Sequence, residues 1–232
     1  MIGILGGMGT QAGLDFCNKL AMLNRGKTDQ KYPLFVLYNK SNIPGRPENL
    51  HQYNKVLKSL YAGCLLLQKN KCKFIVIPCN TAHFWYDDLK KKIKIPIISM
   101  PKEVYSHAKK NCKKNSKIGI LATEATLKTN VYNKFFKRDF TLIKPKESLQ
   151  IKNVNKAIKY VKMGKIGKAE KSIKPAINYL IKMKCRKIIL GCTELPIAIF
   201  AFKSFKKIKL SKIFLDPNLI LANVSMKKYN NS

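Results

Sequence analysis

The 232-residue sequence has few acidic residues, no long apolar run and no paired-cysteine motif. Asp and Glu together number 12, against 46 Lys and Arg, so the formal net charge is +34. No apolar stretch reaches the roughly 20 residues that a membrane-spanning helix needs. No basic segment with a cleavage site precedes the first apolar run. We therefore expect no membrane partner and a cytoplasmic location.

Cysteine is present, but its spacing does not suggest disulfides. The chain has seven Cys, an odd number, with no C-x-x-C pair. This usage favours free thiols in a reducing compartment over a disulfide framework.

Arginine is scarce, because all but four of the 46 basic residues are lysine. Proteins that recognise nucleic acids commonly use the bidentate guanidinium group. The lysines are also spread along the chain rather than gathered in one block. We expect weak, salt-sensitive contact with polyanions and no specific nucleic acid as a partner. A basic nucleic-acid-binding protein stays open as an alternative of another class.

Apolar residues make up 46% of the chain, in short runs that alternate with helical patterns. The predicted strands lie within MIGILG, LFVLYN, KFIVIPCN, IPIISM, SKIGILATEAT, FTLIKP and RKIILGCTELP. The predicted helices cover about 11–25, 48–68, 126–138 and 150–183. Strands rich in Ile, Val and Leu without polar alternation are typical of parallel sheets covered on both faces. The sequence therefore predicts an α/β fold.

The two halves of the chain resemble each other. The first half contains IGILGGMGT at 2–10, and the second half contains the similar IGILATEAT at 118–126. A second pair is KFIVIPCNT at 73–81 and RKIILGCTE at 186–194. The nearly equal offsets predict two similar lobes related by a pseudo-twofold axis. Each lobe is expected to be a mostly parallel sheet covered by helices.

We assign residues 1–100 plus 213–228 to the first lobe and 101–212 to the second. The returning segment FLDPNLILANV has Asp216 as a plausible N-cap and Pro217 at the first helical position. It predicts a helix that closes the first lobe. The terminal SMKKYNNS is expected to be frayed.

The first strand ends in a glycine-rich turn. Gly7, Gly9 and Ala12 fit the G-x-G-x-x-G/A spacing that places a pyrophosphate at a helix N-terminus. The next strand, however, ends in Lys40 and Ser41, without the acidic residue that binds ribose in NAD sites. We favour a small-anion loop over a dinucleotide site or a purely structural turn.

Cys79 and Cys192 each follow a strand of the repeat, at the edge where open parallel sheets bind ligands. Backbone N–H groups of a following helix can lower the pKa of such a thiol. Two such groups on either side of a substrate carbon suit stereoinversion, because one removes a proton and the other donates one. Cys79 and His83 at i, i+4 also suggest metal binding, but no second pair completes a site, so we expect no metal.

The motifs ILGGMG, PCNTAH and LGCTELP, in that order and over nearly the full chain, resemble the aspartate/glutamate racemase family, particularly its aspartate racemase branch. The resemblance implies a two-lobed fold with the active site in the cleft between the lobes. It also implies racemisation of an acidic amino acid without pyridoxal phosphate or another cofactor, and a homodimer. It implies that Cys79 and Cys192 are catalytic. The residues that it implies contact the substrate are Arg46, Asn80, Thr81, Ala82 and Lys162.

Arg46 also stands out without the resemblance. It lies in a Pro/Gly loop after the second strand, where a planar guanidinium can clamp a carboxylate, although an ordinary surface arginine is the alternative. Lys162 has no distinguishing signal among the other lysines. Same-fold enzymes of the maleate isomerase or malonate decarboxylase type, and a scaffold without activity, stay open as alternatives.

Further residues are expected to line the cleft: Met8, Thr10, Thr123, Thr193 and Glu194. Thr123 has a second interpretation as the cap of the following helix, and Glu194 as a group that tunes Cys192 or caps a helix. Met8 and Glu194 stand where glutamate racemases tend to carry an acidic residue and a His. This departure favours the aspartate-type or broad-specificity branch and leaves open the choice between aspartate and glutamate.

Overall fold

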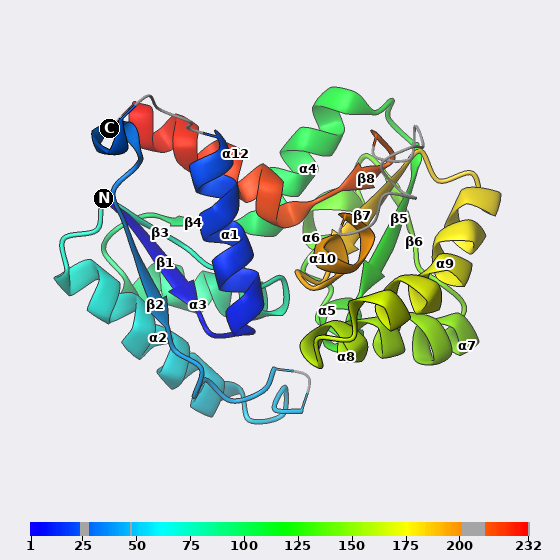
Figure 1. The fold of residues 1–232 in the computed structure, drawn as a ribbon, viewed down its shortest axis with the longest axis horizontal. Coiled ribbons are helices and arrows are strands. Elements are labelled where there is room, and N and C mark those ends of the chain that lie inside the picture. The colour runs from blue at the N-terminus through cyan, green and yellow to red at the C-terminus, as the bar shows by residue number, and fades with distance from the viewer. Residues whose placement is uncertain (24–27, 47, 201–211, 232) are drawn as a thin grey trace. The chain divides into compact units, whose positions relative to one another are not determined.

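The computed structural model describes residues 1–23, 28–46, 48–200 and 212–231. The chain forms two compact units, Met1–Glu103 with Asn218–Ser232 and Val104–Pro217. Each unit holds a parallel four-stranded sheet covered by helices (Figure 1). The predicted α/β class is confirmed.

The strands of the first unit are β1 (Ile2–Gly6), β2 (Phe35–Asn39), β3 (Phe74–Val76) and β4 (Ile97–Ile98). Its helices are α1 (Thr10–Leu23), α2 (Tyr53–Lys69), α3 (Tyr86–Lys92) and nearly all of α12 (Pro217–Asn230), with 3-10 turns η1 (Asp29–Lys31) and η2 (Thr81–Trp85). The strand order is β2-β1-β3-β4. Since β1 lies between two partners and all five of its residues are buried, its uninterrupted apolar sequence is explained.

Helices α1 and α2 cover opposite faces of β1 (Figure 1). Side chains alternate between the faces of a strand, so positions 3 and 6 point in opposite directions. A Cβ atom on Gly3 would lie 3.2 Å from Cβ of Leu67 in α2. A Cβ atom on Gly13, in α1, would lie 3.5 Å from Cα of Gly6. Small residues at these positions allow both helices to pack closely on the strand.

The strands of the second unit are β5 (Lys117–Ala122), β6 (Thr141–Ile143), β7 (Lys187–Gly191) and β8 (Phe214–Leu215). Its helices are most of α4 (Met100–Asn111), then α5 (Glu124–Lys128), α6 (Asn133–Phe136), α7 (Glu147–Leu149), π-helical η3 (Gln150–Asn155), α8 (Lys156–Lys162), α9 (Ile166–Lys182) and α10 (Leu195–Phe200). The strand order is β6-β5-β7-β8. The second sheet therefore repeats the order of the first.

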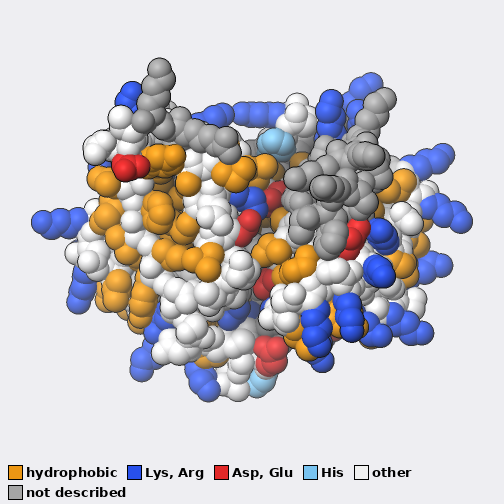
Figure 2. Space-filling view, viewed as in Figure 1, with side chains coloured by type: hydrophobic (Ala, Val, Ile, Leu, Met, Phe, Trp, Pro, Cys, Tyr) orange, Lys and Arg blue, Asp and Glu red, His pale blue; other side chains and the backbone are white. Residues whose placement is uncertain are grey.

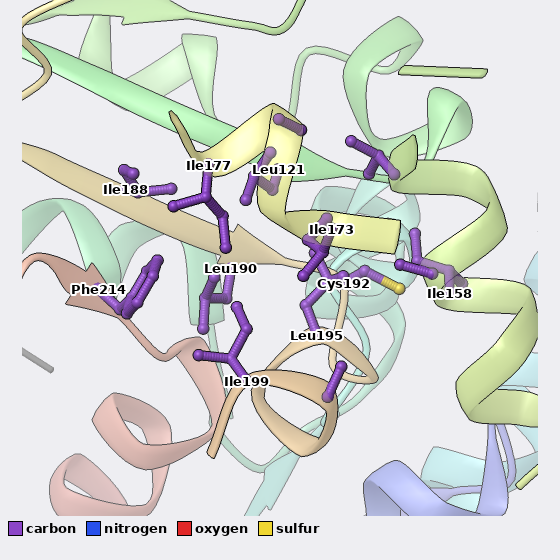
Figure 3. Close-up of a cluster of buried hydrophobic side chains, with 14 of the residues drawn as sticks. Leu121, Ile158, Ile173, Ile177, Ile188, Leu190, Cys192, Leu195, Ile199 and Phe214 are labelled. Atoms are coloured by element: carbon purple, nitrogen blue, oxygen red, sulfur yellow. The ribbon is translucent and has the colours of Figure 1, made fainter. Parts of the chain in front are cut away.

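The core of the second unit lies between its sheet and α9. Figure 3 shows Ile173 and Ile177 of α9 near Leu121 of β5 and Leu190 of β7, and all four are buried in one apolar cluster. Burial of each such side chain contributes about 1.5–3 kcal/mol relative to exposure. The repeated sequence thus supplies each unit with a core of its own.

The chain returns to the first unit later than the predicted range 213–228. β8 pairs with β7, with Phe214 opposite Ile188, so this strand belongs to the second sheet. The first unit resumes at Asn218. The Asn218 Nδ2 group donates to Ala12 O at 3.2 Å and to Asp15 Oδ2 at 3.0 Å, which fixes the start of α12 against α1.

One predicted helix is interrupted. The prediction of a single helix over 126–138 is wrong, because Asn130 has φ 54° and separates α5 from α6. The helices expected across 150–183 are present, and α8 and α9 are separated near Gly164, which has φ 70°. The predicted helix end near Arg25 lies outside the described residues.

Two helix ends also differ from prediction. The helix expected over 48–68 begins at Tyr53. The C-terminal segment is not frayed, because α12 continues to Asn230. Within it, the buried Ser225 Oγ donates to Leu221 O at 2.7 Å. A hydroxyl satisfied in this way can be buried inside a helix, and so the polar composition of this segment was misleading.

Lys and Arg side chains stand around the face seen in Figure 2 and do not form a single patch there. None of the helices in the described part of the chain is long and apolar enough to cross a membrane.

Candidate active site

Cys79 lies just beyond β3, at the carboxyl edge of the first sheet. Pro78 has no N–H for the strand ladder, and the chain turns there, with the Cys79 N–H donating to Ile77 O at 2.7 Å. The Cys79 residue is 6% exposed and its thiol is free. A strand end followed by a tight turn therefore presents this thiol at the sheet edge.

The three predicted contact residues after Cys79 form one buried turn with it. Asn80 precedes η2 and its carbonyl accepts from the His83 N–H at 3.2 Å, while Thr81 and Ala82 are the first residues of η2. All three are buried. Their contact with a substrate stays a prediction.

His83 supports this turn through its ring. Nδ1 lies 2.9 Å from Cys79 O, and Nε2 lies 3.0 Å from the Met100 N–H. The second contact requires Nε2 to accept, so we assign the proton to Nδ1. Burial lowers the pKa of His83 to about 4, which keeps the ring neutral. Because backbone groups occupy both nitrogens, His83 has no free nitrogen to bind a metal with Cys79.

The glycine-rich turn packs against backbone of the neighbouring strand connection. Gly7 has φ 89°, and a Cβ atom there would lie 2.3 Å from the carbonyl carbon of Lys40. This close approach explains why position 7 is a glycine, and the explanation does not require a bound phosphate. Met8 is buried, and the exposed Thr10 accepts from Asn39 Nδ2 at 3.2 Å.

Arg46 reaches this same turn. Its Nη2 donates to Met8 O at 2.6 Å and its Nη1 to Pro44 O at 3.2 Å. The residue is 9% exposed, so it is not the ordinary surface arginine of the alternative interpretation. Nε is buried and has no hydrogen-bond partner among the described residues. Two backbone carbonyls thus hold the guanidinium, and its buried Nε–H has no acceptor within the described part of the chain.

Cys192 occupies the corresponding position in the second unit, directly after β7. Its Sγ donates to Glu194 Oε2 at 2.9 Å, and Thr193 Oγ1 donates to the same oxygen at 3.3 Å. All three residues are buried. Figure 3 shows the Cys192 side chain beside Ile158, Ile173 and Leu195. The predicted lining residues Thr193 and Glu194 therefore both lie next to the thiol.

The environment of Cys192 stabilises the thiol rather than the thiolate. Burial raises its pKa well above the ordinary value, and the Glu194 carboxylate raises it further by charge and by accepting the thiol proton. The Glu194 N–H and the Lys162 charge act in the opposite direction, more weakly. The expectation that backbone N–H groups lower the pKa here was wrong for Cys192, since desolvation outweighs them.

Lys162 is the last residue of α8, and its side chain is exposed. Its charge acts on Cys192, so the structure brings this predicted residue close to the thiol. The preceding π-helical segment is fixed by Gln150, whose Nε2 donates to Ala122 O at 2.9 Å and to Asn155 Oδ1 at 2.8 Å. Gln150 thereby ties the helix that carries Lys162 to the end of β5.

Thr123 is the N-cap of α5. Its Oγ1 accepts from the Thr126 N–H at 3.2 Å. The structure thus supports the capping interpretation, while a position in the lining stays a prediction.

Sequence reasoning missed the roles of three polar residues: Asn39, His83 as a backbone brace, and Gln150. Asn39 ends an apolar strand, which is a usable signal for a residue at the ligand edge. Gln150 lies in a helical pattern where a glutamine is unremarkable, so no local signal identifies it.

The other five cysteines provide a contrast. Cys17, Cys64, Cys72, Cys112 and Cys185 are also free thiols. Burial raises the pKa of Cys64 to about 12 and that of Cys17 to about 11. Cys64 and Cys72 belong to the apolar core of the first unit. These two residues match the interpretation of buried cysteines as small hydrophobic side chains.

A family model for the Asp/Glu/hydantoin racemases matches residues 5–223. The broad specificity amino-acid racemase RacX of Bacillus subtilis is 26% identical over 202 residues, which cover 84% of this chain and 86% of that protein. A glutamate racemase of Sulfurihydrogenibium is 35% identical over 170 residues, covering 72% of this chain and 63% of the relative. The solved structure of Picrophilus torridus aspartate racemase has a TM-score of 0.84 and 28% identity, covering 99% of this chain and 94% of that one.

Proposed function

This chain belongs to the Asp/Glu/hydantoin racemase family and is an amino-acid racemase, and on that premise we propose that it inverts an acidic amino acid, aspartate first, through Cys79 and Cys192. The proposed reaction is a two-base proton transfer without a cofactor. The observation that carries it is the repeated placement of a buried thiol after the third strand of each sheet, at the carboxyl edge.

The proposed reaction needs the carboxyl edges of both sheets to face one substrate. One cysteine, as thiolate, removes the α-proton, and the electron pair stays on the α-carbon. The other cysteine, as thiol, gives its proton to the opposite face of that carbon. The product is the other enantiomer, and the two sulfurs have exchanged protonation states.

Cationic groups are proposed to hold the substrate. Arg46 has a buried Nε–H without an acceptor, which suits a carboxylate oxygen. Lys162 adds positive charge near Cys192. Positive charge close to the α-carbon stabilises the developing carbanion, whose formation is the difficult step. We assign Asn80, Thr81 and Ala82 to substrate contacts, with Met8, Thr10 and Thr193 in the lining.

Aspartate is proposed ahead of glutamate on two grounds. Among solved structures, the Picrophilus torridus aspartate racemase matches with a TM-score of 0.84 over 94% of that chain, and a Thermus thermophilus glutamate racemase with 0.69 over 80% of that chain. Moreover, Met8 and Glu194 differ from the acidic residue and His that glutamate racemases tend to carry at these places.

The test is α-proton exchange in deuterium oxide, with L-Asp, L-Glu and other amino acids, followed by chiral chromatography. We expect deuterium at the α-carbon and loss of optical purity with L-Asp. Cys79→Ser and Cys192→Ser should each lower the rate by about 10³-fold or more, because a hydroxyl is a far weaker acid than a thiol and is not ionised at neutral pH. Cys112→Ser, a half-buried thiol outside both sites, is the matched control. Near-normal racemisation by either catalytic variant would contradict the two-base reaction.

A homodimer is also proposed. The first unit exposes Met22 of α1 at 62% and Leu34, the residue before the edge strand β2, at 67%. Exposed apolar groups beside an unpaired strand edge are a plausible contact between copies. Light scattering at moderate salt should give twice the monomer mass of 26.5 kDa, and a monomer at micromolar concentration would oppose the proposal.

A further inference from the structure

We infer that Glu194 is a positioning residue that keeps Cys192 protonated in the resting enzyme, so that Cys192 begins as the acid and Cys79 as the base. This division of roles rests on the proposed two-base reaction. The inference depends on the hydrogen bond between Cys192 and Glu194. Both residues lie in the second unit, so this hydrogen bond can be tested without substrate.

The carboxylate of Glu194 is fixed on the thiol by three features. Its Oε2 accepts from Cys192 Sγ at 2.9 Å and from Thr193 Oγ1 at 3.3 Å. Glu194 is also the residue from which α10 begins, since its carbonyl accepts from the Ala198 N–H at 3.2 Å. Its backbone is therefore held by the helix while its side chain is held by the thiol and the hydroxyl.

Few charged groups face Cys192. Glu194 does so from the same segment, and Lys162 from the end of α8. Apolar side chains of the same buried cluster, Ile158, Ile173 and Leu195, lie around the Cys192 side chain in Figure 3. In this buried setting a thiolate next to a carboxylate would bring two negative charges together, with Lys162 as the compensating cation. Burial and Glu194 accordingly raise the pKa of Cys192.

Cys79 has no comparable partner. Among the described residues, no side chain forms a hydrogen bond with its sulfur, and its neighbour His83 is turned to the backbone carbonyl of Cys79 and the Met100 N–H. In the sequence repeat that aligns 73–81 with 186–194, Thr81 stands where the second unit has Glu194. The carboxylate thus distinguishes the two cysteines.

The proton balance of a turnover follows from this difference. The substrate α-proton passes to Cys79, and Cys192 gives its proton to the opposite face of the carbanion. This leaves a Cys192 thiolate beside Glu194, the disfavoured state. The resting form is restored when Cys79 releases its proton to water and Cys192 takes one from water. Glu194 accordingly favours this reset.

The experiment measures the alkylation of each cysteine by iodoacetamide as a function of pH, with peptide mass spectrometry to separate Cys79 from Cys192. The variants are Glu194→Gln, which has the same shape without the charge, and Glu147→Gln, an exposed control with the same change of net charge. In the unmodified protein Cys192 should react only at alkaline pH, because burial and Glu194 raise its pKa. Glu194→Gln should move the Cys192 midpoint down by about one pH unit or more, equal to an increase of about tenfold in its rate below the midpoint.

A second readout uses turnover. The doubly deprotonated enzyme lacks an acid, so loss of Glu194 should move the alkaline limb of the kcat/KM profile for aspartate to lower pH, while Glu147→Gln leaves it in place. The ratio of kcat/KM between the two directions gives no information, because both enantiomers are equally stable and the ratio stays at unity in every variant.

The outcomes separate this inference from the proposed function. An unchanged Cys192 midpoint in Glu194→Gln overturns the inference, even if the protein racemises aspartate. A lowered midpoint in a protein that exchanges no α-proton supports the thiol–carboxylate pair and contradicts the proposed reaction. Circular dichroism of the variant at neutral pH verifies that both measurements are made on folded protein.

Discussion

The two units share a sheet and differ in what surrounds its carboxyl edge. Both have a parallel sheet whose first strand is flanked by the second and third. Both place a glycine in the first strand under a helical leucine, Gly3 under Leu67 and Gly119 under Leu180. The glycine of the repeated IGIL motif is therefore a packing residue, since it lets a helix approach the strand.

The differences begin where the strands end. Gly7 turns with φ 89° in the first unit, whereas its counterpart Thr123 has φ −66° and caps α5. After the third strand, a histidine braces backbone near Cys79, and a carboxylate accepts from the thiol of Cys192. A repeated backbone thus positions two similar sulfurs in two different electrostatic environments.

The largest effect is expected from the matched core substitutions Ile75→Ala and Ile188→Ala. Both residues are fully buried in the third strand of their sheets, and each loss should cost about 2–5 kcal/mol of unfolding free energy. Trp85, the single tryptophan, lies in the first unit. If the units unfold separately, Ile75→Ala lowers the denaturant midpoint seen by Trp85 fluorescence, while Ile188→Ala lowers the midpoint seen by circular dichroism alone. Equal shifts of both signals in both variants would show a single cooperative unit.

The second prediction concerns acid stability of the first unit. His83 has a pKa of about 4 when folded and 6.5 when exposed, so between these values the unfolded chain binds the extra proton. Its contribution of about 3 kcal/mol is complete above pH 6.5 and is lost as the pH falls towards 4. We expect His83→Gln to flatten this slope of unfolding free energy against pH. The exposed His51→Gln is the control, and an equal slope in His83→Gln and the unmodified protein argues against this role.

Third, Gly7→Ala should cost about 2 kcal/mol or more. The new Cβ would have to accept both a left-handed backbone and the carbonyl carbon of Lys40 at 2.3 Å. Urea unfolding followed by Trp85 fluorescence measures the loss. Gly167→Ala, at a helical position with open space around it, should be neutral or stabilising; similar losses in both would contradict the steric explanation.

The smallest effect is expected at the counterpart of Gly7. Thr123→Ala removes the side-chain oxygen that accepts from the Thr126 N–H and should cost about 1 kcal/mol. Thr123→Ser keeps that oxygen and should retain most of the stability, as measured by urea unfolding. Equal destabilisation by Ala and Ser would indicate that the methyl group matters more than the cap.

Much of the fold could be predicted from local pattern. The strands rich in Ile and Leu, their parallel pairing and the repeat all follow from burial on both faces of a sheet. Helix boundaries were harder to predict, because Asn130 adopts a positive φ value that the surrounding sequence does not indicate. The C-terminal helix was missed because its buried Ser225 is satisfied by its own backbone.

Some features of the candidate site could likewise be predicted from the sequence, and others depend on tertiary structure. Which thiols lie at strand ends could be predicted from the sequence alone, because a strand end is a local property of the chain. Tertiary structure decided that Arg46 is held by Met8 O, 38 residues away, that His83 braces backbone, and that Glu194 accepts the proton of Cys192. Hydrogen bonds and pKa shifts depend on separations of a few ångströms and on exclusion of water, and only the packed chain sets both.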